Sequence, residues 1–425
     1  MMKRPLTALF VITSVGFFLY MSSRIIHPPP LARNNQLLTL TRLGSPWKIS
    51  PVSQKRPTIP REGPEIRQIV FAKVHKAASS TMQNIFMRFA LARNLSLVLP
   101  KQKTSVSEHL SVIDRDKIVP HPQARQIYDV LCSHVLYDEE QISRYFPKAA
   151  VRIAIVREPL KQALSALKYY YRVWDPTGAL RRGYKKYKTD PINSFLQHPE
   201  DFYIESRGPS NSYINNRMSV DLGFQLNSFE ESKRNNTKIK EFLKKVQRQF
   251  DVVLVSDYFD ESLVLMRRIL RWAMKDIVYL KVNVGEEQTR PEWHKKPLLN
   301  STVVQKFREW DEIDFQLYDQ FSNIFLETIV REPLFWEELK AFRTIQTDVR
   351  YFCLEDKTSK ILKIAQTVWT NSFSISRLEC ELMCTDEIKL TNLMRAIQTK
   401  RYEDYMKRKN NPTLLRERKK RSEVL

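Results

Sequence analysis

The chain has 425 residues and carries 70 Lys and Arg against 47 Asp and Glu, which gives a formal net charge of +23. Its 8 glycines make up about 2 % of the chain, against a usual ~7 %, and neither G-x-G-x-x-G nor G-x-x-x-x-G-K-[ST] occurs, so glycine-rich nucleotide loops are excluded. Hydrophobic residues at 42 % suffice for a sizeable core and exclude global disorder, while the positive charge favours an anionic partner.

The amino terminus predicts a membrane anchor. Lys3 and Arg4 precede an uncharged stretch at 5–23, and Arg24 follows it. A helix of this length spans roughly 28 Å, close to the ~30 Å hydrocarbon core, and the basic residues keep residues 1–4 in the cytoplasm. A cleaved signal peptide is the alternative. Because the end of the stretch lacks an A-x-A-like site, we favour an uncleaved signal anchor that leaves the remaining chain lumenal.

Composition divides the rest of the chain into three parts. Residues 24–64 contain eight prolines, which predicts an extended stem. The apolar periodicity that builds a core is found at 65–399, the predicted lumenal domain. Residues 400–425 are charged and poor in apolar side chains, which is typical of a frayed helix or a solvated tail.

Apolar runs alternate with amphipathic segments through the predicted domain. Strands are predicted at 66–72, 126–132, 151–156, 252–255 and 277–282. Helices are predicted at 80–92, 139–145, 159–172, 238–250 and 260–274, and helices dominate 302–342. This alternation predicts an α/β fold, a parallel central sheet flanked by helices with a helical C-terminal part. Ligands of such sheets bind at the carboxyl ends of the strands.

The segment after the first predicted strand is the best candidate for an anion site. Its sequence, KVHKAASST at 73–81, contains Lys76, two small residues and three consecutive hydroxyls where a helix begins. The free N–H groups and the dipole of a helix start attract anions, and hydroxyls donate to phosphate oxygens. An ordinary Ser/Thr N-cap is the alternative interpretation.

A second candidate follows the third strand. Arg157 comes directly after VRIAIV, and Ser165 lies eight residues later on the next predicted helix. The forked arginine side chain suits phosphate. The same Arg-Glu-Pro tripeptide recurs at 331–333, where we interpret it as a helix start.

These segments together resemble the galactose 3-O-sulfotransferases. The similar stretches are VFAKVHKAASSTMQNIFMRFA, LCSHV, AIVREPLKQALSAL, YINNRMSVDLGF, and VLVSDYFDESLVLMRRILRW with DIVYLKVN, in the family's order over about 66–330. The resemblance implies a P-loop NTPase-like sulfotransferase fold in a single-pass type II protein of the Golgi membrane. It also implies transfer of the sulfonyl group of 3′-phosphoadenosine-5′-phosphosulfate to the 3-hydroxyl of galactose in glycolipids or glycoproteins.

The resemblance also assigns residues by position. Lys76 matches the catalytic lysine, and Arg157 with Ser165 matches the pair that binds the 3′-phosphate. The remaining donor-binding matches lie in the loop around the 5′-phosphosulfate: Lys73, His75, Ala78, Ser79, Ser80 and Thr81. One position departs from the family, because Ala77 stands where threonine is usual.

The acceptor hydroxyl must lose a proton, and histidine is the default base near neutral pH. His134 follows the second predicted strand and matches the C-x-H segment of the family, so we predict that it is the base. A structural histidine is the alternative for His134, and Glu205 is a weaker candidate for the base. No metal is predicted, since lysine and backbone dipoles supply positive charge and no H-E-x-x-H occurs.

Other features bear on the acceptor and the compartment. Asn211, Tyr213 and Asn215 offer polar groups that suit sugar hydroxyls. Residues 168–190 hold seven Lys and Arg against two Asp, which suits either an acidic glycan or membrane surface or a solvated loop. Glycosylation sequons and a disulfide pairing fit a lumenal domain; the residues are Asn94, Asn235 and Asn300, and Cys353 with Cys380 or Cys384.

Two other functions remain open at this stage. One is a sulfotransferase for a different position, such as a uronic acid or hexosamine of a glycosaminoglycan. The other is a non-catalytic lumenal protein that binds nucleotide or glycan, for which Ala77 is the only hint. A nucleic-acid partner is disfavoured by the predicted anchor. The sequence makes no prediction of the oligomeric state.

Overall fold

The computed structural model describes residues 63–107, 109, 111–173, 175–281 and 297–411. The predicted anchor at 5–23, nearly all of the predicted stem and the end of the charged tail lie outside these residues. Within the described ranges, no helix combines the length and apolar character that are needed to cross a bilayer.

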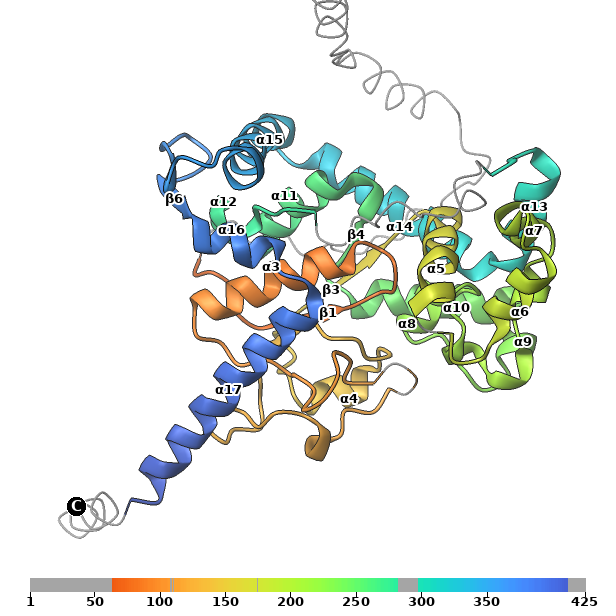
Figure 1. Cartoon of the computed structure of the whole chain (residues 1–425), viewed down its shortest axis with the longest axis horizontal. Helices are drawn as coiled ribbons and strands as arrows, with labels where there is room; N and C mark the ends of the chain where they lie inside the picture. The colour runs from red at the N-terminus through yellow and green to blue at the C-terminus, as the bar shows by residue number, and fades with distance from the viewer. Residues whose placement is uncertain (1–62, 108, 110, 174, 282–296, 412–425) are drawn as a thin grey trace, which may run out of the picture. The chain divides into compact units, whose positions relative to one another are not determined.

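A parallel four-stranded sheet forms the centre of the described structure (Figure 1). Its strands lie in the order β2, β1, β3, β4, with bounds Val130–Leu131, Ile69–Ala72, Val151–Val156 and Val252–Val255. These β-branched, nearly fully buried runs are typical of strands covered on both faces. The register sets Phe71 opposite Ile153, and Ile155 opposite Leu254. All four carboxyl ends therefore point to the same edge of the sheet.

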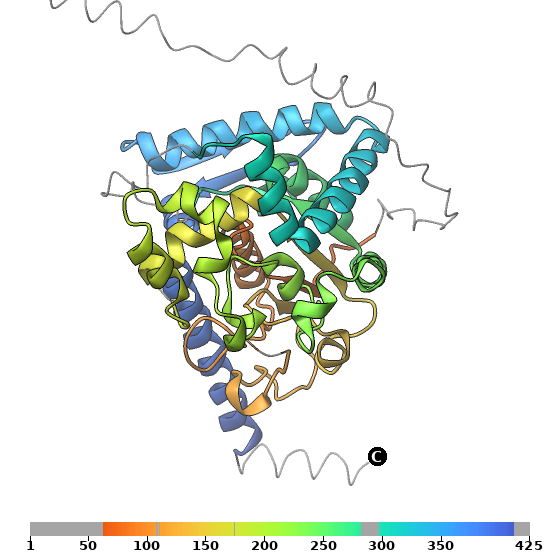
Figure 2. The ribbon, with the colours of Figure 1, turned by 90° about the vertical axis from the view of Figure 1, so that its right-hand side faces the viewer.

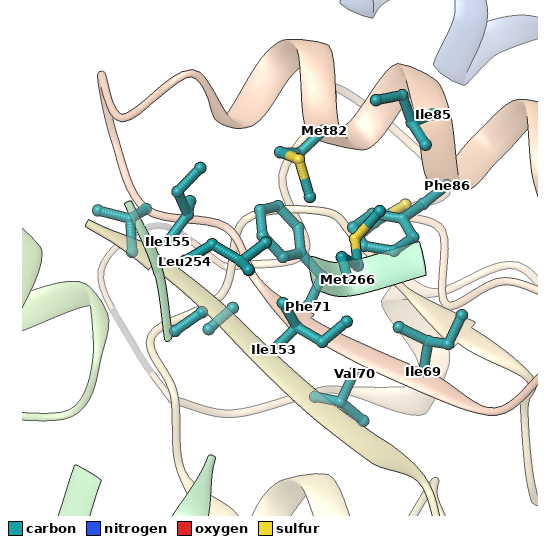
Figure 3. Packing of buried hydrophobic residues seen from close by; sticks show 14 of the residues in the cluster. Ile69, Val70, Phe71, Met82, Ile85, Phe86, Ile153, Ile155, Leu254 and Met266 are labelled. Carbon is teal, nitrogen blue, oxygen red and sulfur yellow. The ribbon is translucent and has the colours of Figure 1, made fainter. Parts of the chain in front are cut away.

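Helix α3 (Ser79–Ala92) packs its apolar side onto these strands. Met82, Ile85 and Phe86 recur at helical spacing and point toward the sheet (Figure 3). The ring centroid of Phe86 lies 5.0 Å from that of Phe71 on β1. Burial of each such side chain contributes roughly 1.5–3 kcal/mol to stability, so this contact holds α3 against β1.

The remaining helices cover the sheet and build a second, smaller apolar cluster around Phe195. In chain order they are α4 (Glu139–Ser143), α5 (Pro159–Val173), α6 (Ala179–Lys186), α7 (Pro191–Gln197), α8 (Arg217–Asp221), α9 (Phe229–Ser232), α10 (Asn236–Gln249), α11 (Phe259–Leu270), α12 (Met274–Ile277), α13 (Ser301–Trp310), α14 (Glu312–Arg331), α15 (Phe335–Arg350), α16 (Arg377–Cys384) and α17 (Glu387–Lys409).

The carboxyl-terminal part is helical apart from a short hairpin of β5 (Ile361–Ile364) and β6 (Phe373–Ser376). Helices α14 and α15 run in succession along one side of the domain (Figure 2). Helix α17 begins beside α3 (Figure 1). There the amide of Asn84 on α3 donates to the carbonyls of Leu382 at 2.9 Å and Thr385 at 3.3 Å. The C-terminal helices are thus attached to the helix that follows the predicted donor loop.

The predicted strands at 151–156 and 252–255 match β3 and β4, whereas the predicted strand at 277–282 is wrong in its described part. Residues 274–277 are helical, and the backbone that follows is satisfied by side chains instead of a neighbouring strand. Arg88 donates to the carbonyl of Val278 at 2.6 Å, and Gln346 accepts from the N–H of Tyr279 at 3.2 Å. The apolar run is therefore buried without joining the sheet. Helix α17 also crosses the domain boundary predicted at residue 400.

Candidate active site

The candidate site lies where the ends of three neighbouring strands meet. Lys73 follows β1, His134 lies three residues after β2, and Arg157 follows β3. His134 Nδ1 donates to the carbonyl of Lys73 at 2.9 Å, and Arg157 Nη1 donates to the carbonyl of Lys76 at 2.8 Å. Side chains from both flanking strands therefore hold the backbone of the loop between β1 and α3.

This loop takes a conformation that usually calls for glycine. Lys76 has φ of 59° and Ala78 has φ of 60°, both in the left-handed region. That region costs a non-glycine residue roughly 1–2 kcal/mol. Ala77, between them, is fully buried. The loop therefore turns without glycine.

The start of α3 has the open N–H groups of an anion site. Its N-cap residue is Ala78, which has no side-chain cap hydrogen bond, and its first turn holds no acidic residue. Ser79 and Ser80 lie inside the helix, so the interpretation of these hydroxyls as an ordinary N-cap is wrong. The first N–H groups and the positive end of the helix dipole remain directed at the loop. Of the three hydroxyls predicted to bind the donor, Ser79 and Thr81 are buried and Ser80 is partly exposed.

Lys76 is the cation beside this helix start. Its ammonium group lies 3.8 Å from the centroid of the Tyr169 ring on α5. The pKa of Lys76 is lowered to about 8. Burial is the largest cause, and the charge of Arg157 contributes more than the charge of Lys73. The ammonium thus carries its charge at neutral pH, and a bound anion would stabilise that charge.

The hydrogen bonds of His134 fix its tautomer. A carbonyl only accepts, so the bond to Lys73 requires the proton on Nδ1 and leaves the lone pair on Nε2. Burial lowers the pKa of His134 well below its usual range, and the neighbouring His75 and Lys73 act in the same direction. His134 is therefore neutral at pH 7, with Nε2 ready to accept a proton.

A second imidazole stacks on the first. The ring of His75 lies 3.8 Å from that of His134, with 14° between their planes. His75 is almost fully buried, and its backbone N–H and its Nδ1 both lie 2.8 Å from Asp221 Oδ2. Asp221 also pairs with Arg217 at 2.8 Å. This buried carboxylate fixes the ring that packs against His134, and no motif predicted from the sequence indicated it.

Helix α8, which carries Arg217 and Asp221, has only five residues and depends on α14 for its position. Asp314 on α14 accepts from the N–H groups of Met218 at 2.9 Å and Ser219 at 2.7 Å. Burial raises the pKa of Asp314 to about 6. The Asp314 contacts satisfy the first turn of α8, and they connect α14 through α8 to the stacked histidines.

Lys73 does not face the open side of the loop. Its ammonium lies 2.6 Å from Gln83 Oε1 and 2.6 Å from Glu387 Oε1, and its side chain is fully buried. Glu387 Oε2 also accepts from the hydroxyl of Ser80 at 3.0 Å. Glu387 begins α17, more than 300 residues from the loop, and no motif in the sequence indicated it.

The family model of galactose-3-O-sulfotransferase matches residues 2–374 of the chain. The chain belongs to the galactose 3-O-sulfotransferase family. The family predicted from the loop and its neighbouring segments is thereby confirmed, and the parallel sheet flanked by helices agrees with the predicted α/β sulfotransferase fold.

Three relatives show the range of similarity. Galactose-3-O-sulfotransferase 2 of Mus musculus is 29 % identical over 310 residues, which cover 70 % of this chain and 73 % of the relative. The protein of the same name from Homo sapiens is 30 % identical over 300 residues, covering 69 % and 70 %. Galactosylceramide sulfotransferase of Homo sapiens is 28 % identical over 292 residues, covering 68 % and 64 %.

The three residues predicted to contact the acceptor differ in how they are placed around the stacked histidines. Tyr213 reaches the site, because its ring lies 5.1 Å from His75 and stacks on Tyr170 at 3.8 Å. Asn215 is fully buried, and its Oδ1 accepts from the side-chain amide of Asn216 at 2.8 Å. The side-chain amide of Asn211 donates to the carbonyl of Arg207 at 2.8 Å.

Ser165 and Glu205 lie on other elements than His134. Ser165 lies on α5, partly exposed, in the second turn after Arg157. Glu205 is exposed and lines a pocket of about 290 Å³ beside Trp310, whose lining includes neither histidine nor Lys76. That pocket is therefore distinct from the predicted donor loop.

The structure gives positions for the cysteines and sequons that were predicted to suit a lumenal domain. Cys353 and Cys380 form a disulfide with 5.3 Å between their Cα atoms, while Cys384 is exposed and unpaired. The three sequon asparagines are exposed, and two of them are N-caps, of α10 and α13: Asn94, Asn235 and Asn300.

Proposed function

We propose that this chain transfers the sulfonyl group of 3′-phosphoadenosine-5′-phosphosulfate to the 3-hydroxyl of galactose in glycolipids or glycoproteins. The observation that carries the proposal is the meeting of Lys76, the open start of α3 and a neutral His134 at the ends of β1 and β2. A cation, an anion-binding helix start and a base are the three components that such a transfer needs.

The donor would be held by the loop and its flanks. The N–H groups at the start of α3 and the hydroxyl of Ser80 suit the oxygens around the 5′-phosphosulfate. Arg157, at the end of β3, presents a guanidinium for the 3′-phosphate, and Ser165 lies on the helix that follows it. The buried Lys73 contributes charge from beneath the loop without direct contact.

In the transfer, the bond between sulfur and the bridging phosphate oxygen breaks while a bond from the galactose oxygen to sulfur forms. Lys76 stabilises the negative charge that grows on the leaving oxygen. His134 Nε2 accepts the proton of the attacking hydroxyl, since its Nδ1 is held by the Lys73 carbonyl. Lys76 and the helix dipole supply the positive charge, so we propose a transfer without a metal ion.

His134 is a better candidate for the base than His75. His134 is partly exposed, whereas His75 is almost fully buried and its Nδ1 is held by Asp221. The stacked rings share one environment, so protonation of one opposes protonation of the other. His75 therefore acts as the packing partner that keeps the ring of His134 in place.

The compartment is part of the same proposal. We infer a single-pass type II protein of the Golgi membrane, anchored at 5–23, with its catalytic domain in the lumen. The Cys353–Cys380 disulfide and the exposed sequons support an oxidising, glycosylating compartment. The names of the relatives support galactose-containing acceptors, on lipid or on protein.

A transfer assay tests the proposal. The full chain, purified in detergent, is incubated with labelled donor and a panel of β-galactosides, a galactosylceramide and glycosaminoglycan chains. We expect label on the galactosides or the galactolipid. Transfer confined to uronic acid or hexosamine would favour the alternative sulfotransferase, and donor binding without transfer to any acceptor would favour a non-catalytic protein.

A further inference from the structure

Glu387, the first residue of α17, places its carboxylate against two residues of the predicted donor segment, Lys73 and Ser80. Glu387 accepts from the Ser80 hydroxyl at 3.0 Å and pairs with the Lys73 ammonium at 2.6 Å. Burial opposes its ionisation, but the Lys73 charge and the bond from Ser80 outweigh that effect and lower the pKa of Glu387. An ionised carboxylate thus lies beside the polar groups that we propose for donor binding. Glu387 lies beyond residues 2–374, which the family model matches.

The Ser80 hydroxyl cannot serve Glu387 and the donor at once. A serine hydroxyl has one proton to donate, and a phosphate oxygen accepts only. Ser80 is also the partly exposed member of the three hydroxyls at this helix start. A donor phosphate that binds Ser80 must therefore displace the bond to Glu387, and the two anions repel each other while they share the loop.

The backbone around Glu387 is fixed, so the side chain is the part that can move. Asp386 caps α17 by accepting from the N–H of Lys389 at 2.9 Å. The preceding Leu382 and Thr385 carbonyls are bonded to Asn84 on α3. The Glu387 side chain is 18 % exposed and has three rotatable bonds, so it can leave Ser80 without unwinding the helix.

We propose that Glu387 is the counter-ion of the donor loop. In the free protein it binds the Ser80 hydroxyl and the Lys73 ammonium, and it releases the Ser80 hydroxyl when the donor binds. The inference rests on the proposed function. Glu387 is a positioning residue here, because it acts on the donor through Ser80 and Lys73. Its role gives the carboxyl-terminal helix control over donor affinity.

The variant Glu387→Gln tests this role. The amide oxygen keeps an acceptor for Lys73 but removes the negative charge beside the donor. We expect adenosine 3′,5′-bisphosphate, the donor's product, to bind on the order of tenfold tighter by calorimetry at pH 7, because one like-charge repulsion and one competing bond are weakened. Glu403→Gln, the same change at an exposed position of α17, is the matched control and should leave the affinity unchanged.

The competition for one proton predicts a coupling between two substitutions. In the wild type, Ser80→Ala removes a donor contact but also removes the bond that the donor has to displace, so affinity should change less than about threefold. In the Glu387→Gln background the same substitution should weaken binding by roughly tenfold. If Glu387→Gln does not fold by circular dichroism, Glu387→Asp, which keeps the charge and shortens the reach to Ser80, takes its place in the cycle.

A further readout separates this role from a purely structural one. The charge of Glu387 raises the pKa of Lys76 against the effects of burial, Arg157 and Lys73. Glu387→Gln should therefore move the loss of bisphosphate binding at alkaline pH to lower pH. Weaker or unchanged binding in Glu387→Gln, or equal effects of Ser80→Ala in both backgrounds, would overturn the inference. Absence of bisphosphate binding by the wild type would instead overturn the proposed function.

Discussion

His134 donates its Nδ1 proton to the backbone carbonyl of Lys73 across 2.9 Å. This bond joins the end of β2 to the start of the donor loop, and it decides which nitrogen of the ring is left to accept a proton. Because the same loop carries Lys76 three residues later, the proposed base and the proposed cation for the leaving group are both attached to one short stretch of backbone.

Replacement of His134 by alanine should remove the base without removing the donor site. We expect kcat to fall by about 10²–10⁴, the usual contribution of a positioned base, while bisphosphate affinity stays within about threefold of the wild type. His198→Ala, at the partly exposed histidine that ends α7, is the control. Near-normal turnover of His134→Ala would show that His134 is not the base, and His75 would be the next residue to test.

Activity should decline at alkaline pH as Lys76 loses its proton. The pKa of Lys76 is about 8 in the free protein, and the protonated form is the active one, so kcat/KM for the donor should fall above about pH 8. A bound anion favours the ammonium, so the decline in kcat should occur at higher pH. Lys76→Arg keeps its charge and should lose the alkaline decline in any activity that remains. A decline that persists unchanged in Lys76→Arg would rule out Lys76 as its source.

The buried pair of Asp221 and Arg217 should matter for both stability and turnover. Asp221→Asn leaves the Arg217 charge buried without its partner, which should cost about 3–5 kcal/mol of unfolding free energy and lower kcat at least tenfold through a misplaced His75 ring. The matched control is Asp201→Asn, whose partner Lys186 lies at the surface, where an ion pair contributes at most about 1 kcal/mol. Chemical denaturation and steady-state rates measure the two effects. Equal losses in both variants would contradict the buried network.

The left-handed backbone of the donor loop should carry measurable strain. Ala78 is exposed and has φ of 60°, so Ala78→Gly should raise the unfolding free energy by about 0.5–1 kcal/mol. Ala77→Gly, one residue earlier, removes a fully buried methyl group without relieving a positive φ and should destabilise instead. The two melting curves should shift in opposite directions; a lower melting temperature of Ala78→Gly would mean that Ala78 is not strained.

The parts of the fold that sequence predicted best are those that depend on local pattern. The runs at 151–156 and 252–255 are short, apolar and β-branched, and both are strands with the predicted bounds. The equally apolar run at 277–282 failed in its described part, because Arg88 and Gln346 bond its backbone groups. Whether a buried run joins a sheet depends on such distant partners, which a local pattern does not contain.

The candidate site divides in the same way. The positions of Lys76 and His134 at the strand ends were predictable, because each follows a recognisable strand, and their roles stay predictions. Asp221 and Glu387 were not, since their contacts with His75 and Ser80 arise from helices that are far away in sequence. Asn215 was predicted to contact the acceptor because its amide suits sugar hydroxyls and its segment resembles the family, and the structure buries the side chain, so this role stays a prediction.

The position of the sulfate on the product tests the account most directly. After reaction of the full chain with donor and a β-galactoside, nuclear magnetic resonance of the purified product identifies the esterified carbon. We predict a sulfate ester at O3 of galactose, and its loss in Lys76→Ala and His134→Ala variants that remain folded. A product esterified at any other hydroxyl, or an O3 product formed at the wild-type rate by either variant, would contradict the account.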